Sequence, residues 1–196
     1  ILDSYRLANT LVPGDLGSFL RGGDAVLSAA RHALEWVLQE GVTEGLAGGS
    51  LSHDANNVKL QAPILPSTKV ICMMMTYPDH VQTYQKQIDE DEEKGETTSV
   101  GALPHTYPHY FVKMSQVVVG PEEWVILPKL HPQPVVYGTE MTVVIGKKAR
   151  IVSEKEAMDH IWGYTILNDL TLLGRYNPNH KVFDTCAPIG PWIVPA

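Results

Sequence analysis

The stretch Tyr137–Pro191 decides the fold, and it reads YGTEMTVVIGKKARIVSEKEAMDHIWGYTILNDLTLLGRYNPNHKVFDTCAPIGP. Two of its apolar runs have the length of β-strands, and each carries a carboxylate at one end. Glu140 opens the first run, Asp169 closes the second, and Lys181 follows. Carboxylates at the ends of apolar strands, with a lysine nearby, indicate a site for a hard metal ion beside a cation that stabilises negative charge.

Side chains alternate along a strand, so Glu140 shares one face of its run with Gly138, Thr142 and Val144. A carboxylate among apolar neighbours needs a partner. The candidates are a metal ion, Lys181 or Arg175. For Asp169 an Asx turn is the alternative to a metal role, because Asn and Asp both form such turns.

Two further features frame this stretch. Ser153 and Glu156 have the spacing of a helix capping box, which predicts a short helix to about His160. Upstream, TKVICMMM predicts a strand buried on both faces that runs into TYPDH and places His80 at a sheet edge. His80 is therefore either a site residue or a turn histidine beside the next helix. The acidic run DEDEE that follows predicts a solvated face or a loop that could act as a lid.

Composition limits the class of protein. The chain has 196 residues and a formal net charge of -7, which argues against nucleic-acid binding. Its two cysteines lie far apart in apolar surroundings, which favours buried thiols in a reducing compartment over a disulfide. The sequence shows no membrane span and no signal peptide, so we expect a cytoplasmic protein that does not bind membranes.

The first part of the chain predicts a separate layer. Helical spacing of apolar residues predicts a helix from Ala25 to Gln39, with Asp24 as its N-cap and Gly41 as its stop. We therefore expect a small α/β N-terminal domain over residues 1–60. The mixed, mostly-β remainder, residues 61–196, would hold the site.

Four blocks in this remainder together resemble the fumarylacetoacetate hydrolase family. TYPDH resembles the family's G-x-N-Y-x-D-H, and YFVKMSQVVVG its F-x-K-x-x-S-x-x-x-G. TEMTVVIG with the following GYTILND resembles its E-x-E-L-x-V-V-I-G and later N-D. KVFDTCAPIGPWIV resembles its K-S-x-D-T-x-x-P-x-G-P-W-x-V. The blocks occur in family order over roughly residues 66–196.

The resemblance implies a twisted β-roll with few short helices, and a homodimer. It implies a metal-dependent enzyme, with Mg²⁺ or Mn²⁺, that acts on a 2-oxo acid or β-dicarbonyl of the acylpyruvate type. C–C bond hydrolysis is the first expectation, and decarboxylation, isomerisation or tautomerisation is the alternative. The family normally continues beyond GPWIV, so the C-terminal part of its fold is expected to be missing from this sequence.

Carried over by position, the resemblance makes Glu140 and Asp169 metal ligands and His80 and Lys181 catalytic residues. A substrate-binding role falls on Lys113, Thr171, Arg175 and Asp184. Lys113 read by itself is either an anion-binding lysine or an edge residue whose ammonium reaches water.

The sequence also departs from the family pattern. Gly138 stands where a first metal-ligating glutamate is expected, and Thr83 where a glutamate orients the histidine. Leu173 stands where an arginine is expected, with Arg175 two residues later. These losses motivate a third hypothesis, a non-catalytic member with a structural or binding role.

Overall fold

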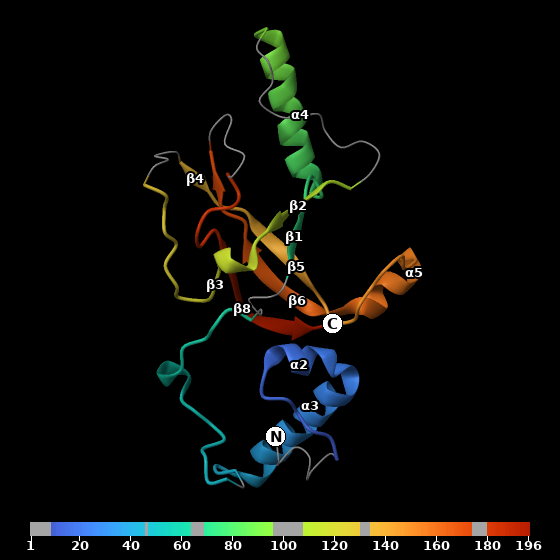
Figure 1. The fold of residues 1–196 in the computed structure, drawn as a ribbon, viewed down its shortest axis with the longest axis vertical. Coiled ribbons are helices and arrows are strands. Elements are labelled where there is room, and N and C mark those ends of the chain that lie inside the picture. Colours follow the sequence, from blue (N-terminus) through green and yellow to red (C-terminus); the bar gives the residue numbers. More distant parts are fainter. Residues whose placement is uncertain (1–8, 46, 64–68, 96–107, 130–133, 174–179) are drawn as a thin grey trace.

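The computed structural model describes residues 9–45, 47–63, 69–95, 108–129, 134–173 and 180–196. The fold is mostly β with few short helices, as predicted, and its centre is a four-stranded sheet (Figure 1). The strand order is β3-β8-β6-β5. These strands are β3 (Val118–Val119), β5 (Thr139–Ile145), β6 (Ile161–Asn168) and β8 (Ala187–Pro195).

The two apolar runs of the deciding stretch pair with each other. β5 lies antiparallel to β6, with Thr139 opposite Asn168 and Val144 opposite Gly163. Their connection contains α5 (Glu154–Ala157) and a 3₁₀ turn (Met158–His160), as predicted. Glu156 Oε2 accepts hydrogen bonds from the Ser153 backbone N–H (3.3 Å) and hydroxyl (2.6 Å). The register brings Glu140 and Asp169 to the same end of the hairpin.

β5 shows the predicted alternation between its two faces. Glu140, Thr142 and Val144 are half-buried, whereas the residues between them are exposed. The exposed side is apolar, since Met141 and Ile145 keep 69% and 59% of their accessible surface. β5 is therefore covered on the face that carries Glu140 and open on the other.

Two short antiparallel pairs flank the sheet. β1 (Val70–Met73) pairs with β2 (Tyr110–Lys113), and β4 (Val135–Val136) pairs with β7 (Thr171–Leu172). The prediction that the β1 run is buried on both faces is wrong, because Ile71 and Met73 are exposed. A two-stranded pair has one face against the core and leaves the other open.

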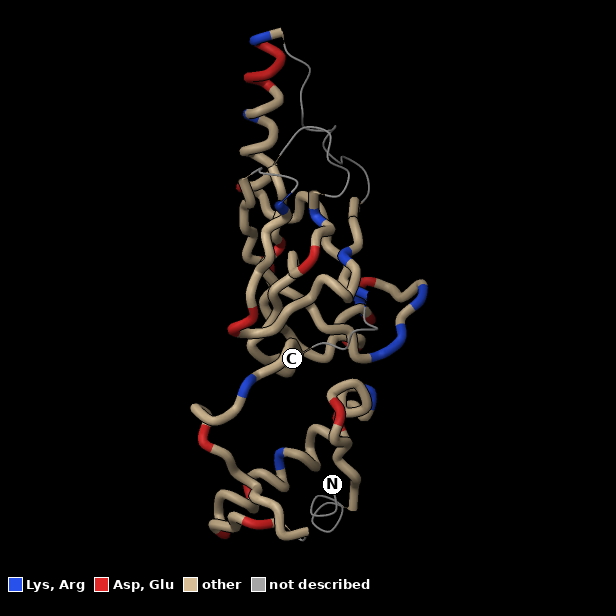
Figure 2. Tube along the Cα trace, turned by 60° about the vertical axis from the view of Figure 1, so that its left-hand side comes forward, with Lys and Arg blue, Asp and Glu red and all other residues tan. Residues whose placement is uncertain are grey.

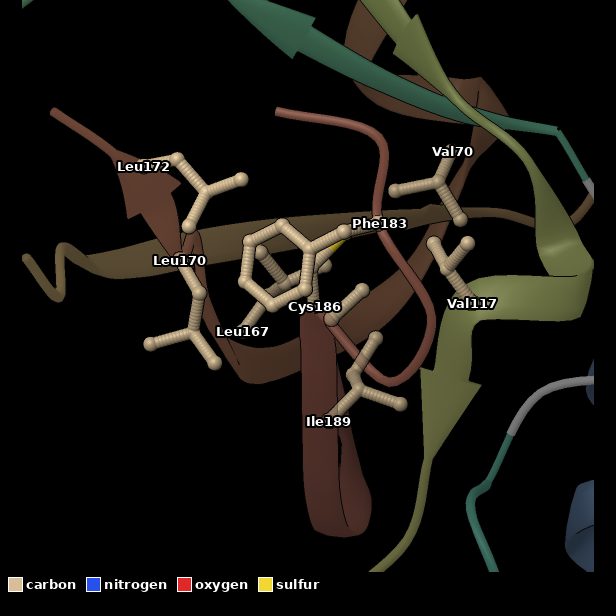
Figure 3. Close-up of a cluster of buried hydrophobic side chains, with 9 residues drawn as sticks. Val70, Val117, Leu167, Leu170, Leu172, Phe183, Cys186 and Ile189 are labelled. Carbon is tan, nitrogen blue, oxygen red and sulfur yellow. The ribbon is translucent and has the colours of Figure 1, made fainter. Parts of the chain in front are cut away.

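A buried apolar cluster lies where these strands meet (Figure 3). Its side chains come from β1, β6, β7, β8 and the turns that precede β3 and β8. It consists of Val70, Val117, Leu167, Leu170, Leu172, Phe183, Cys186, Ala187 and Ile189. Both cysteines are free thiols, with Cys186 buried and Cys72 half-buried. Asp169 directly precedes Leu170, a member of this cluster, so the candidate site borders the buried core.

The N-terminal segment contains two α-helices among its described residues. α2 (Leu16–Arg21) and α3 (Gly23–Glu40) lie below the sheet in Figure 1. The predicted helix and its stop at Gly41, which has a left-handed φ of 63°, are confirmed. The predicted N-cap at Asp24 is wrong, because α3 begins at Gly23 and Asp24 lies in its first turn. Over residues 9–45 and 47–63 the β structure is limited to one bridge between Glu44 and Ser50.

The acidic run belongs to a helix rather than to a loop. α4 (Pro78–Glu93) projects away from the sheet, and its outer end carries the acidic residues (Figures 1 and 2). Pairs one turn apart support it, such as Gln85 with Asp89 (2.8 Å) and Lys86 with Glu90 (4.0 Å). Among the described helices, none is long and apolar enough to cross a bilayer.

Candidate functional site

Asp169 is the centre of the candidate site. It follows β6, and its backbone N–H donates to the Gly138 carbonyl (2.7 Å), which ties it to the start of β5. Only 7% of the residue is exposed. Its carboxylate contacts the ammonium groups of two lysines, Lys113 and Lys181.

The two lysines approach opposite oxygens of this carboxylate. Lys181 Nζ donates to Asp169 Oδ2. Lys113 Nζ lies 2.9 Å from Asp169 Oδ1. The angle at this second contact does not meet hydrogen-bond geometry, so Oδ1 is a buried oxygen without a hydrogen-bond donor among the described residues. Oδ1 therefore interacts with Lys113 through charge rather than through a hydrogen bond.

Lys181 has further partners that fix its position. Its ammonium donates to Thr171 Oγ1 (2.9 Å) and lies 4.8 Å from the centre of the Phe111 ring. Such an ammonium over an aromatic face gains a cation–π interaction. A quarter of the Lys181 side chain stays exposed, so a small anion can reach it.

Glu140 borders the same space as Asp169. A Cβ placed on Gly138 would lie 3.4 Å from Glu140 Oε1 and 3.9 Å from Asp169 Cβ. Both side chains therefore border Gly138, which stands where the sequence resemblance expects a first glutamate. Of the partners predicted for Glu140, Lys181 bonds Asp169 instead, and Arg175 lies outside the described residues.

The donors in this space fit a hard divalent cation. Over the part of the chain that is described, no group of three or more His, Cys, Asp or Glu side chains converges. Mg²⁺, however, is commonly held by one or two carboxylates while waters or substrate oxygens fill its other positions. The carboxylates of Glu140 and Asp169 supply that smaller set.

The structure adds Cys72 to the site, which the sequence analysis did not assign. Cys72 lies on β1 opposite Phe111 of β2. Burial raises the pKa of its thiol to about 11, and the charge of Asp169 adds to this, while the lysines partly oppose it. The charges of the Asp169, Lys113, Lys181 and Glu140 side chains all affect this pKa, so the thiol lies within electrostatic range of the site. The sequence signal that could have identified Cys72 is its position in the strand that leads into TYPDH and His80.

His80 lies in the first turn of α4 and is exposed. Its ring packs against Tyr84 (4.8 Å between centres), and the Thr83 hydroxyl donates to the Asp79 carbonyl (2.9 Å). In the described residues no hydrogen bond or ion pair joins His80 to the two carboxylates. The Tyr77 hydroxyl accepts a bond from the Met141 N–H (3.4 Å), so this end of α4 does reach β5 next to Glu140.

The four residues expected to bind substrate have different surroundings. Thr171 accepts a hydrogen bond from Lys181 and is half-buried, and Asp184 is exposed. Lys113 has no exposed surface, so it is not an edge residue reaching water. Arg175 lies outside the described residues. The structure thus brings Glu140, Asp169, Lys181 and Thr171 together, with Lys113 beneath them.

Comparison with known proteins shows the family. Residues 69–196 match the family described as fumarylacetoacetate (FAA) hydrolase C-terminal. This region covers most of the chain and contains every element of the site. The chain belongs to the fumarylacetoacetate hydrolase family, as the sequence motifs suggested.

Individual relatives carry different activities in their names. Oxaloacetate tautomerase YisK of Bacillus subtilis is 31% identical over 189 residues, which cover 93% of this chain and 57% of the relative. A 2-hydroxyhepta-2,4-diene-1,7-dioate isomerase from Mycobacterium marinum is 30% identical, with a TM-score of 0.52 and coverages of 71% and 46%.

A third relative has the same fold at lower identity. Maleylpyruvate hydrolase from Sphingobium sp. SYK-6, in complex with manganese(II) and pyruvate, is 22% identical with a TM-score of 0.63, and the match covers 98% of this chain and 59% of that one. The chain spans about half the length of the curated relatives it matches.

Proposed function

We propose that the site binds a 2-oxo acid and promotes its keto–enol tautomerisation at a divalent cation, Mg²⁺ or Mn²⁺. The observation that carries the proposal is the meeting of Glu140 and Asp169 around Gly138, with Lys181 against Asp169. The name of the tautomerase that matches 93% of this chain supports the reaction type. The manganese and pyruvate named for the structural neighbour support the class of ligand.

The chemistry needs few groups. In tautomerisation one proton leaves the carbon next to the carbonyl, one proton arrives at the carbonyl oxygen, and no bond between heavy atoms breaks. A bound divalent cation would polarise the carbonyl and lower the energy of the enolate. Lys181, which is partly exposed, offsets the negative charge that develops on the oxygen. His80 at the start of α4 is the candidate for moving the proton.

Within the described part of the chain no hydrogen bond or ion pair joins His80 to a carboxylate, and this favours tautomerisation over hydrolysis. C–C hydrolysis requires an activated water, and a carboxylate partner commonly orients the histidine that activates it. Thr83 stands at that position, and its hydroxyl bonds the helix backbone instead. Hydrolysis of an acylpyruvate is therefore the second candidate reaction.

The test follows enol decay of oxaloacetate by ultraviolet absorbance, with Mn²⁺ or Mg²⁺ and after metal removal. We expect metal-dependent acceleration that Glu140→Gln lowers on the order of 100-fold, about 3 kcal/mol of transition-state stabilisation. Glu154→Gln is the matched control, because Glu154 is exposed on α5 away from the site.

The other outcomes are equally informative. Acceleration that persists in the chelator and in Glu140→Gln contradicts the proposal. Release of two acids from an acylpyruvate, with no enol decay, assigns hydrolysis instead. Failure to accelerate either reaction, together with failure to bind Mn²⁺, supports a structural or binding role.

A further inference from the structure

Lys113 is a cation that the structure buries completely. It ends β2, and its exposed fraction is 0%. Removing an ammonium from water costs several kcal/mol unless charge and hydrogen bonds compensate for it. The residue must therefore make interactions inside the protein that a neutral side chain would not make.

Its ammonium connects three separate segments of the chain. It lies 2.9 Å from Asp169 Oδ1 and donates to the carbonyls of Lys181 (2.8 Å) and Leu170 (3.3 Å). It also lies 3.3 Å from both the carbonyl and the Sγ of Cys186. Because an ammonium has three donors, these acceptors use its capacity and leave none for a substrate.

These contacts close a ring through the candidate site. Lys113 holds the side chain of Asp169 and the backbone of Lys181, while the Lys181 side chain bonds Asp169 in turn. Two of these backbone acceptors have a second donor as well: the Cys186 carbonyl accepts from the Leu170 N–H (3.3 Å), and the Lys181 carbonyl from the Cys186 thiol (3.3 Å). The position of Lys181 relative to Asp169 thus depends on a residue that has no surface exposed to solvent.

We propose that Lys113 is a positioning residue, which sets the geometry of Asp169 and Lys181 from beneath, and not a substrate-binding residue. The inference rests on the proposed function of the same site. Residues that orient metal ligands typically contribute about 10–100-fold to metal affinity or activity when they are removed. A substrate contact would instead change KM.

The test compares Lys113→Met, which keeps length and removes charge, with Lys59→Met. Lys59 is a matched control because it is an exposed lysine paired with Glu123 at 3.5 Å. Mn²⁺ affinity is measured by calorimetry, and kcat and KM by enol decay. We expect folded Lys113→Met to lose about tenfold or more in Mn²⁺ affinity and in kcat, with KM within about twofold.

Two results overturn the inference in a folded variant. One is unchanged Mn²⁺ affinity and kcat. The other is a higher KM with unchanged kcat and metal affinity, which would restore the substrate-binding interpretation.

Amide hydrogen exchange separates this inference from the proposed function. If the wild-type protein binds no Mn²⁺ and shows no turnover, the proposed function fails. The positioning role then requires faster exchange in Lys113→Met over residues 169–172 and 180–186, with α3 unchanged. Unchanged exchange in those two segments overturns it.

A double variant covers the case in which Lys113→Met does not fold. Asp169→Asn removes the buried charge that Lys113 balances, so Lys113→Met with Asp169→Asn should recover a cooperative unfolding transition. Failure of the double variant to recover would show that Lys113 does not act through Asp169.

Discussion

Gly138 is the residue at which this site differs most from a full carboxylate set. A Cβ there meets only atoms at 3.4 Å or beyond, so the backbone accepts a side chain. Gly138→Glu should therefore add a third carboxylate next to Glu140 and Asp169. We expect Mn²⁺ affinity, measured by calorimetry, to rise about tenfold or more, because affinity increases with the number of charged ligands.

Gly138→Ala is the matched control for this prediction. Its methyl group fits the same space without adding a ligand, so metal affinity should stay within about twofold of the wild type. An equal gain in both variants would show that reduced backbone freedom, and not a new ligand, caused the change.

Cys72 gives a reporter of the charge at the site. Burial and the Asp169 carboxylate raise its thiol pKa from 9.0 to about 11. At about pH 8 the thiolate fraction, and with it the iodoacetamide reaction rate, should be about 100-fold below that of an ordinary thiol. The rate should rise only as the pH nears the raised pKa. Asp169→Asn should speed the reaction, and an unchanged rate would place Cys72 outside the reach of Asp169.

At the scale of elements, the pairing of β6 with β8 depends on Gly163. A Cβ on Gly163 would lie 2.2 Å from the Val194 carbonyl oxygen, a backbone atom that has no room to yield. Gly163→Ala should thus lower the free energy of unfolding by about 1–3 kcal/mol. Chemical denaturation measures this loss, and the tolerated Gly138→Ala serves as the comparison. Equal stability of the two variants would contradict the described β6–β8 pairing.

The strands β5 and β6 and the helix α4 show which elements could be predicted from local sequence patterns. Period-two alternation predicted β5 and β6, and with them the carboxylates at one end of the hairpin, because alternation is a property of neighbouring residues. The acidic run DEDEE predicts a solvated face or a loop, and the structure shows it as the last turns of the helix α4. Side-chain pairs one turn apart support this helix instead of core packing.

At the scale of the whole molecule, an aromatic contact joins the N-terminal helices to the sheet. The Phe19 and Trp162 rings meet edge to face at 5.9 Å, beside a cavity of about 250 Å³. An aromatic pair contributes about 0.5–1.5 kcal/mol. Phe19→Ala should therefore speed amide exchange in α2 by about tenfold at most and leave β6 unchanged. Leu38→Ala, at an exposed position, is the control. Faster exchange in β6 would contradict this limited coupling.

The site as a whole was only partly predictable. Motif spacing identified Glu140, Asp169 and Lys181, which the structure brings together at one end of the β5–β6 hairpin. The family resemblance gave Lys113 a substrate-binding role. Its actual partners could not be predicted, because no local pattern links Lys113 to Leu170, 57 positions away, or to Cys186, 73 positions away. Burial of that ammonium follows from tertiary packing alone. The domain boundary near residue 60 and the homodimer stay predictions.

The ring of Lys113, Asp169 and Lys181 has a consequence for ligand choice when Glu140 is counted with it. The charges of its two ammonium groups and two carboxylates cancel, so the side chains of the site are formally electroneutral as a set. A bound divalent cation would give the site a net charge of about +2. A dicarboxylate would neutralise this charge, whereas a monocarboxylate would neutralise only half of it. We therefore expect kcat/KM for a dianionic 2-oxo acid to exceed that for its monoester. The preference should shrink as added salt screens the unbalanced charge.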